Sequence, residues 1–474
     1  MSLLSVDIYF FILWSYIFYK INKGYSIAVY LVKDCVAFFP PMEEDKEYIK
    51  EDKDQKKEDN KKDNGQFPIR TFKPDLELTK HVKEFLVEYD FTVLLSLILI
   101  MTYLTSMIFK IFVPSDNNSS FIFYSMSILL VLTVYYKIKH NTFPYDLSDE
   151  NKILIMFAFK AFIFSYMITG YFTEYFDFQL ERGIQELQVR TDQILKVTGN
   201  RYRYSNDTFY IALSVASAFL SITVVHLAVK FAYNFYFLNK TANDPDIEED
   251  METAGRVQRY RILMTINFFT PLIAIFLYIP ALSRSMVVPD IMTNEGFDVF
   301  RITFLLITIL LKGSVFLYEV QFSFNESYFY VQSLLKNKSE KLFDYITLKI
   351  KLKFINTWVT CFKYLGIILI PLFLTLLHMY KYFEANRFPE KVEYDFSAYQ
   401  ATLEKSEFVE NAEPMGSLTD SKFFIEVFKQ IAVKGLIPAR LQADILNYLI
   451  FSFYLSWFFV STIGLLYYRK FKTA

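Results

Sequence analysis

Charged side chains inside apolar segments are the residues of this sequence that could do chemistry. Lys160, Lys312 and Lys363 each interrupt a stretch long enough to cross a lipid bilayer. An ammonium group near the middle of a bilayer costs about 2.5–3.5 kcal/mol on insertion scales, so each lysine should find a carboxylate, a carbonyl oxygen or water. Such residues line ion or solute pathways, or they form static pairs between helices and extend toward the headgroups. The candidate acidic partners are Asp90, Glu174, Asp177, Glu319 and Asp444.

Uncharged residues in the same kind of segment predict where helices bend and meet. Pro271 and Pro371 each remove a backbone hydrogen bond and are candidate helix kinks. Asn267, four residues before Pro271, can bond a freed carbonyl or a neighbouring helix. A kinked helix that carries an asparagine fits either a gate or ordinary packing. Ser217 and Ser221, one turn apart, favour close approach of another helix.

Enzyme signatures are absent from the sequence. It contains no phosphate-binding loop, dinucleotide-binding glycine motif, nucleophile elbow or His-Glu-x-x-His zinc motif. The four histidines are scattered, and the two cysteines, Cys35 and Cys361, form neither a disulfide framework nor a zinc site. A net charge of −1 gives no electrostatic case for nucleic acid. We therefore expect a protein that is not an enzyme and holds no metal or cofactor, with a membrane-embedded lipid enzyme as the least favoured alternative.

The elements that must position these residues are membrane-spanning helices. Hydrophobic residues make up 53% of the 474 residues, and several segments reach the roughly 20 apolar residues that a span requires. The sequence predicts an all-α, polytopic transmembrane helix bundle of about nine spans plus amphipathic interfacial helices. It predicts an integral protein of the plasma membrane or an endomembrane. The expected spans are 3–19, 91–112, 121–137, 153–173, 208–230, 262–282, 301–319, 354–380 and 445–468.

Composition divides the chain into five parts. Residues 1–42 hold an N-terminal hydrophobic helix, alternatively a signal peptide, and an interfacial helix near 24–39. Within 43–63, 17 of 21 residues are charged, which predicts a disordered loop. Amphipathic helices are expected near 174–205 and 318–354. The parts are 1–42, the charged loop 43–85, the multi-span core 86–381, an acidic flexible loop 382–430, and a last span with a short basic tail at 431–474.

Lysines and arginines in short connections predict the orientation. They are concentrated in the loop 336–353 and the tail 469–472, which places the tail in the cytosol and, with nine helices, the N-terminus outside. Asn117, Asn118 and Asn206 head glycosylation sequons in connections on the outer side. They are the glycosylation candidates.

The order of several short motifs resembles the transmembrane protein 161 family. Each motif alone is weak, whereas their order and spacing together are more specific. The motifs are EYDFTV at 88–93, FKA at 159–161, TEYFDFQLERG at 173–183, INFFTPL at 266–272, FDVFR at 297–301 before the span that holds Lys312, and the tail GLLYYRKFKTA.

This resemblance implies a function but no active site. Family members are multi-pass membrane proteins without an established catalytic activity, associated with potassium and calcium currents in excitable cells and with resistance to oxidative stress. It implies a non-enzymatic regulator of ion currents or ion homeostasis that sits in the lipid bilayer and has ion channels or other membrane proteins as partners, with the oligomeric state undefined. The alternative is a transporter or channel lined by Lys160, Lys312 and Asn267. The positions that match family motifs are Lys160, Glu174, Asp177, Glu181, Asn267, Arg301 and Lys312.

Overall fold

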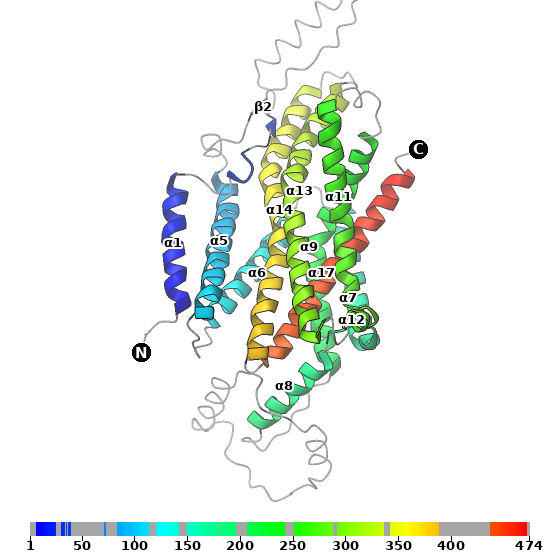
Figure 1. The fold of residues 1–474 in the computed structure, drawn as a ribbon. Coiled ribbons are helices and arrows are strands. Elements are labelled where there is room, and N and C mark those ends of the chain that lie inside the picture. The colour runs from blue at the N-terminus through cyan, green and yellow to red at the C-terminus, as the bar shows by residue number, and fades with distance from the viewer. Residues whose placement is uncertain are drawn as a thin grey trace, which may run out of the picture.

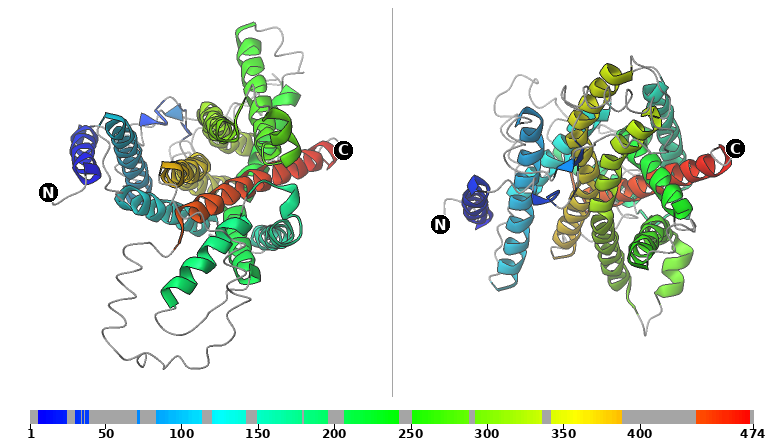
Figure 2. Two further views of the ribbon diagram at one scale, coloured as in Figure 1. Left: turned by 60° about the horizontal axis from the view of Figure 1, so that its bottom comes forward. Right: turned by 90° about the horizontal axis from the view of Figure 1, so that it is seen from above.

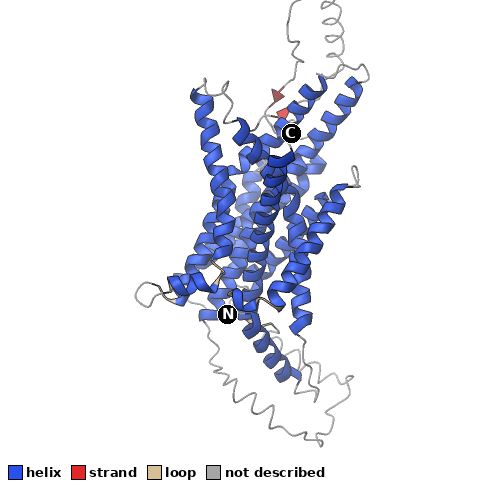
Figure 3. Ribbon diagram, turned by 90° about the vertical axis from the view of Figure 1, so that its right-hand side faces the viewer, coloured by secondary structure: helices blue, strands red, loops and turns tan. Residues whose placement is uncertain are grey.

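In the computed structural model the chain is a bundle of long helices, most of whose axes are roughly aligned (Figures 1 and 3). The structure describes residues 6–24, 30–33, 35, 37–38, 71–72, 83–112, 120–141, 149–178, 180–195, 206–241, 251–287, 292–335, 342–387 and 437–471. The helices are α1 (Val6–Gly24), α5 (Lys83–Phe112), α6 (Ser120–Asn141), α7 (Asp149–Gly170), α8 (Leu180–Leu195), α9 (Asn206–Thr241), α11 (Met251–Phe276), α12 (Pro280–Met286), α13 (Asn294–Leu335), α14 (Leu342–Arg387) and α17 (Ala439–Phe471). The other elements are the 3-10 turn η2 (Thr173–Tyr175) and the strands β1 (Ala37–Phe38) and β2 (Thr71–Phe72).

Helices dominate because the apolar segments leave backbone groups no water to bond in a bilayer, so each N–H and C=O must pair within its own segment. Buried hydroxyls follow the same rule. Thr102 donates to the Ile98 carbonyl at 2.7 Å, and Ser214 donates to the Tyr210 carbonyl at 2.7 Å. These polar side chains are thereby accommodated inside the bundle without a partner from another helix.

The number of spans corrects the expectation of nine. Seven described helices, α5, α6, α7, α9, α13, α14 and α17, are long and apolar enough to cross a membrane. The bent pair α11–α12 makes an eighth if it is counted as one span. The helix expected at 3–19 is present as α1, but Asp7, Lys20 and Lys23, together with tyrosines and a tryptophan, lower its hydropathy.

A sharp break interrupts the segment expected to span at 262–282. The axes of α11 and α12 differ by 86°, with Leu277–Ile279 between the two helices and Pro280 opening α12. Proline is well suited to the first turn of a helix, where its missing N–H is not needed. Pro271, which suggested the kink, lies inside α11. The bend therefore lies closer to the second proline than to the first.

The centre of the bundle is the packing of α9 against α17. Figure 2 shows α17, in red, crossing the bundle obliquely with α9, α11, α13 and α14 around it. Gly464 of α17 and Ala232 of α9 meet where the two helices approach closely. Ser217 and Ser221 on α9 are buried, consistent with the role of small residues in letting helices come together.

Helix α1 packs along α5 at one side of the bundle (Figure 1). The Trp14 indole N–H donates to the Thr105 hydroxyl at 3.3 Å, and the Ser106 hydroxyl donates to the buried Asp7 carboxylate. Polar contacts, and not only apolar ones, therefore join α1 to α5.

The interfacial helix expected over 24–39 lies only partly within the described residues. Tyr30 is helical, Leu31–Lys33 form a turn, and β1 pairs antiparallel with β2, with Ala37 opposite Phe72, while residues 25–29 lie outside the described residues. Strand β2 lies within the expected charged loop 43–85, and most of that loop and of the acidic loop 382–430 lies outside the described residues.

The amphipathic segments extend the bundle beyond the membrane core. Helix α8 accounts for the one expected near 174–205, and it packs on the start of α17 through Ile184 and Leu441. The segment expected near 318–354 is formed by the continuous end of α13 and the beginning of α14, so both helices are longer than their apolar parts.

Candidate functional site

Lys312 lies in the core of the bundle, at the meeting point of α11, α13 and α17. Only 5% of its surface is exposed, and its amine lies 3.7 Å from the centroid of the Trp457 ring. An ammonium over the face of an indole is attracted by the electron density of the ring, most strongly where water is excluded. Trp457 thus provides part of the stabilisation that water would otherwise supply.

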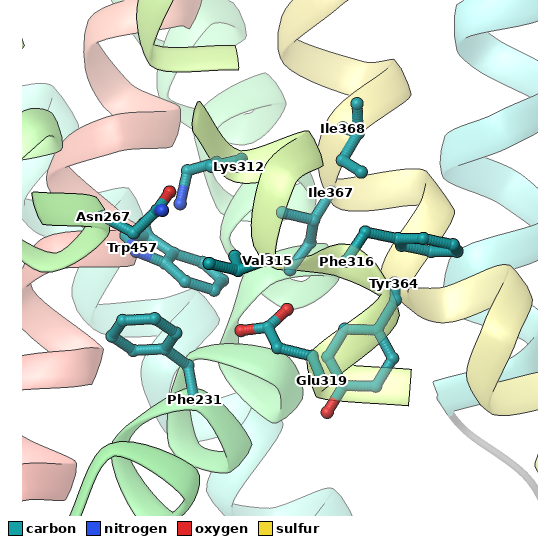
Figure 4. A pocket seen from close by; sticks show the side chains of 10 residues that line it. All are labelled: Phe231, Asn267, Lys312, Val315, Phe316, Glu319, Tyr364, Ile367, Ile368 and Trp457. Atoms are coloured by element: carbon teal, nitrogen blue, oxygen red, sulfur yellow. The ribbon is translucent and has the colours of Figure 1, made fainter. Parts of the chain in front are cut away.

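Asn267 joins α11 to α13 beside this lysine (Figure 4). Its side-chain NH₂ donates to the Leu311 carbonyl of α13 at 2.9 Å and to the Leu263 carbonyl of its own helix at 3.0 Å. The side-chain oxygen is buried and has no hydrogen-bond partner among the described residues. The asparagine therefore bonds across helices and leaves one buried acceptor available.

Glu319 brings the opposite charge to the same cavity. It lies two turns after Lys312 on α13, is also buried, and attracts the lysine electrostatically. The cavity volume is about 10 Å³, about the space of one water molecule. The residues that line it are Phe231, Asn267, Lys312, Val315, Phe316, Glu319, Tyr364, Ile367, Ile368 and Trp457 (Figure 4). This cavity can hold a bound water near two opposite charges, and it lacks the width of an aqueous channel.

A second charge cluster surrounds Arg301 near the start of α13. The Arg301 guanidinium lies 2.5 Å from Asp298 and 3.7 Å from Asp177, and its carbon is 5.0 Å from the centroid of the Tyr278 ring. Arg301 itself is buried, and both carboxylates are only partly exposed. A planar guanidinium can serve two acids and a ring at once, which an ammonium cannot.

The break between α11 and α12 is tied to this cluster. The Asp177 backbone N–H donates to the Tyr278 carbonyl at 2.9 Å, and the Tyr278 hydroxyl donates to Asn447 of α17 at 2.9 Å. The Phe178 ring packs against the rings of Tyr278 and Phe451. The motif after α7 therefore holds the broken span, α13 and α17 together at one end of the bundle.

The residues selected from the sequence fall in three places. Asn267 and Lys312 share the first cluster, and Arg301 and Asp177 share the second. Lys160 is exposed on α7 and lies 5.7 Å from the ring of Phe157. The structure does not bring Lys160 to Lys312.

The remaining selected residues lie apart from both clusters. Glu174 and Glu181 are exposed, and the Thr173 hydroxyl donates to Glu181 at 3.4 Å. Pro371 is buried in α14, where its carbonyl accepts a hydrogen bond from Thr375 at 2.7 Å. Of the sequon asparagines, Asn206 is exposed at the start of α9, and Asn117 and Asn118 lie outside the described residues.

Three residues of these environments were not identified from the sequence. Asp298 stands three residues before Arg301 in the same motif, a spacing that places both on one helix face. The contact of Trp457 with Lys312 cannot be predicted from the local sequence, because Trp457 lies on α17, far along the chain. Lys137, at the end of the expected span 121–137, lies outside both clusters and is buried against α14, where a methyl group at Gly366 would lie 3.0 Å from its side chain.

Neither cluster resembles a metal centre. Within the described ranges no group of three or more His, Cys, Asp or Glu side chains is placed to hold a metal ion. The described side chains of both clusters interact through opposite charges, aromatic rings and hydrogen bonds inside the helix bundle.

Seven or eight candidate spans packed around buried charges define an integral, multi-pass membrane protein. The family model described as predicted transmembrane protein 161AB matches residues 2–472, and the chain belongs to this family. No solved structure matches the chain.

Proposed function

We propose that this protein is a non-enzymatic regulator of membrane ion currents, chiefly potassium and calcium currents, that acts through contacts between its helices and channel proteins. The current-regulating role is what the family resemblance implies. The proposal places it in the plasma membrane or an endomembrane, where the same action would serve ion homeostasis or stress protection. The observation that carries the proposal is that Lys312 and Glu319 are buried and line one small cavity.

The small volume of the cavity around Lys312 and Glu319 favours a regulator over a transporter. A transporter lined by Lys312 and Asn267 needs space for a solute or a hydrated ion beside them, whereas the cavity has room for about one water molecule. Lys312 and Glu319 both belong to α13, so other contacts tie this helix to its neighbours: the Lys312 amine lies over the Trp457 ring of α17, and Asn267 of α11 donates to the Leu311 carbonyl. Such contacts suit a protein whose output is a helix arrangement that another membrane protein contacts.

Whole-cell recordings test the proposal. Currents are compared in cells with and without the protein, and with three variants at matched surface amounts: Lys312→Leu, the double variant Lys312→Leu/Glu319→Leu, and Leu310→Ala on the exposed face of the same helix. We expect the wild type and Leu310→Ala to shift potassium or calcium currents and both charge variants to lose most of that shift. A wild type without effect on either current contradicts the regulatory role.

Reconstituted vesicles test the alternative. The purified protein in liposomes should give no flux of K⁺, Ca²⁺ or Cl⁻ above that of empty liposomes. Flux that disappears in Lys312→Leu would establish the transporter reading instead.

A further inference from the structure

Lys160 lies on the most lipid-exposed span of the described bundle. Only 22% of the α7 span is buried by other parts of the protein, against 72% for α14. The side chains of Phe159, Ile163 and Phe164 around it are exposed, as lipid-facing residues of a membrane helix are. Lys160 is exposed among them.

The depth of Lys160 makes this exposure unusual. It follows Lys152 by eight residues and precedes Gly170, the other end of the span, by ten. At a rise of about 1.5 Å per residue, the two ends lie about 12 and 15 Å away along the helix. A lysine side chain is shorter than either distance, so it does not reach the headgroups easily.

No acidic side chain of the described chain pairs with Lys160. Its contact is with the ring of Phe157, on the preceding turn of the same helix. A charge at this depth normally faces a partner or a wet cavity, and among the described residues no acidic partner faces Lys160.

A groove between α7 and α17 begins beside this lysine. It has a volume of about 110 Å³, and Lys160, Phe164, Tyr448, Ser452 and Ser456 are among the residues that line it. Ser165 and Tyr448 bond to each other across it, so their polar atoms are satisfied. Ser452 is buried, whereas the small side chain of Ser456 is partly exposed and allows another helix to approach closely.

We propose that this groove docks a membrane-spanning helix of another protein that carries a Glu or Asp side chain at mid-depth, with its carboxylate paired to Lys160. This deepens the proposed function, on which it rests, by naming the chemistry of the contacting partner. The exposed ammonium requires an opposite charge, and a spanning helix can present one at the depth of Lys160. Ser456 and the exposed rings of Phe164 and Phe459 receive the rest of the partner helix surface.

Other occupants fit the depth less well. An anionic phospholipid or a fatty acid carries its charge at the headgroup level, about half a bilayer away from Lys160. A second copy would need an exposed acid in the central turns of a span. Glu319 is the acid found there among the described spans, and it is buried.

Model helices provide the test. The full-length protein is reconstituted in neutral phosphatidylcholine vesicles with a synthetic leucine–alanine spanning helix that carries one central Glu, or Gln at the same position. Energy transfer between labels on protein and peptide measures binding. We expect the Glu peptide to bind about three- to thirtyfold more tightly than the Gln peptide, the range that interhelical polar contacts support.

Variants assign the effect to Lys160. Lys160→Met should remove the preference for Glu, Lys160→Arg should keep it, and Lys160→Glu should transfer it to a peptide with a central Lys. Ser456→Phe should weaken binding by filling the groove while the lysine remains. Since Lys160 is exposed, thermal unfolding of these lysine variants should match the wild type.

Two results overturn the inference. One is equal binding of the Glu and Gln peptides to the wild type, and the other is an unchanged preference for Glu in Lys160→Met. Saturable, Lys160-dependent binding of oleate without any peptide preference would identify a lipid anion as the occupant and also overturn it. Separate current recordings distinguish the two proposals. A wild-type protein that shifts currents but shows no preference for the Glu peptide contradicts only the docking of an acidic helix. A wild-type protein that prefers the Glu peptide but shifts no current contradicts only the regulatory role.

Discussion

Gly464 of α17 lies so close to Ala232 of α9 that a methyl group at position 464 would be 2.8 Å from the Ala232 Cβ. Gly464→Ala should therefore separate the two helices and lower the free energy of unfolding by about 1–3 kcal/mol, the usual cost of overpacking. Thermal unfolding of the detergent-solubilised protein measures the effect.

Gly313 offers the matched control within another span. A methyl group at this position would meet nothing within 4 Å. Gly313→Ala should be neutral or stabilising, because alanine favours the helix over glycine by roughly 0.5–1 kcal/mol. Equal losses in both alanine variants would mean that the close approach of α9 and α17 does not limit stability.

Removal of Arg301 should destabilise the end of the bundle. Arg301→Leu leaves Asp177 and Asp298 without their shared cation, and because both acids are partly exposed we expect a loss of about 2 kcal/mol, below that of a fully buried pair. Arg301→Lys should recover only part of it, because an ammonium lacks the planar fork. Thermal unfolding provides the measurement.

Arg284→Leu is the control for that series. Arg284 is exposed on α12, near the same end of the bundle, so its replacement should change stability by less than about 0.5 kcal/mol. If Arg284→Leu costs as much as Arg301→Leu, loss of a positive charge and not the shared pair explains the result.

The hydrogen bond from Asn267 to α13 should contribute measurably to the free energy of unfolding. Asn267→Leu removes the bond to the Leu311 carbonyl, and we expect a loss of about 1 kcal/mol, typical of such bonds in membranes. Asn239→Leu is the comparison, because Asn239 donates to Phe235 of its own helix. A greater loss for Asn239→Leu than for Asn267→Leu contradicts the assigned role.

Helix α1 allows a prediction about the two ends of the chain. Its first turn lies at the opposite end of the bundle from the end of α17 (Figure 1). If α1 crosses the bilayer beside α5, epitope tags at the two termini should be accessible from opposite sides. Loss of the N-terminal tag from the mature protein would instead indicate a cleaved signal peptide, and tags on one side would indicate that α1 does not cross.

The sequence predicted the spans better than the contacts between them. Apolar length is a local property, so most helices could be placed from it. The count of nine exceeds the structure because Asp7, Lys20 and Lys23 lower the hydropathy of α1, and because the segment expected at 262–282 is broken at Leu277–Ile279. The packing of α1 on α5 and the bend between α11 and α12 both depend on contacts with other helices, which the local sequence does not show.

The candidate site was predicted in its residues but not in its arrangement. Lys312 and Asn267 were selected for their polarity, and the structure places them in one cavity, whereas Lys160 lies on the outer face of α7. Lipid-facing and core positions of a membrane helix have similar apolar neighbours, so the side on which a lysine lies cannot be read from them. Trp457 could not be paired with Lys312 for the same reason.

The spacing of Lys312 and Glu319 along α13 has an electrical consequence. Seven residues correspond to about 10 Å along the helix, roughly a third of the hydrocarbon thickness of a bilayer. A membrane voltage of about 100 mV acts on one charge with about 2.3 kcal/mol over the full thickness, so two opposite charges a third of that thickness apart differ in electrical energy by roughly 0.8 kcal/mol. When both residues are charged, they form a dipole set along the bundle, and the voltage across the membrane acts on this dipole.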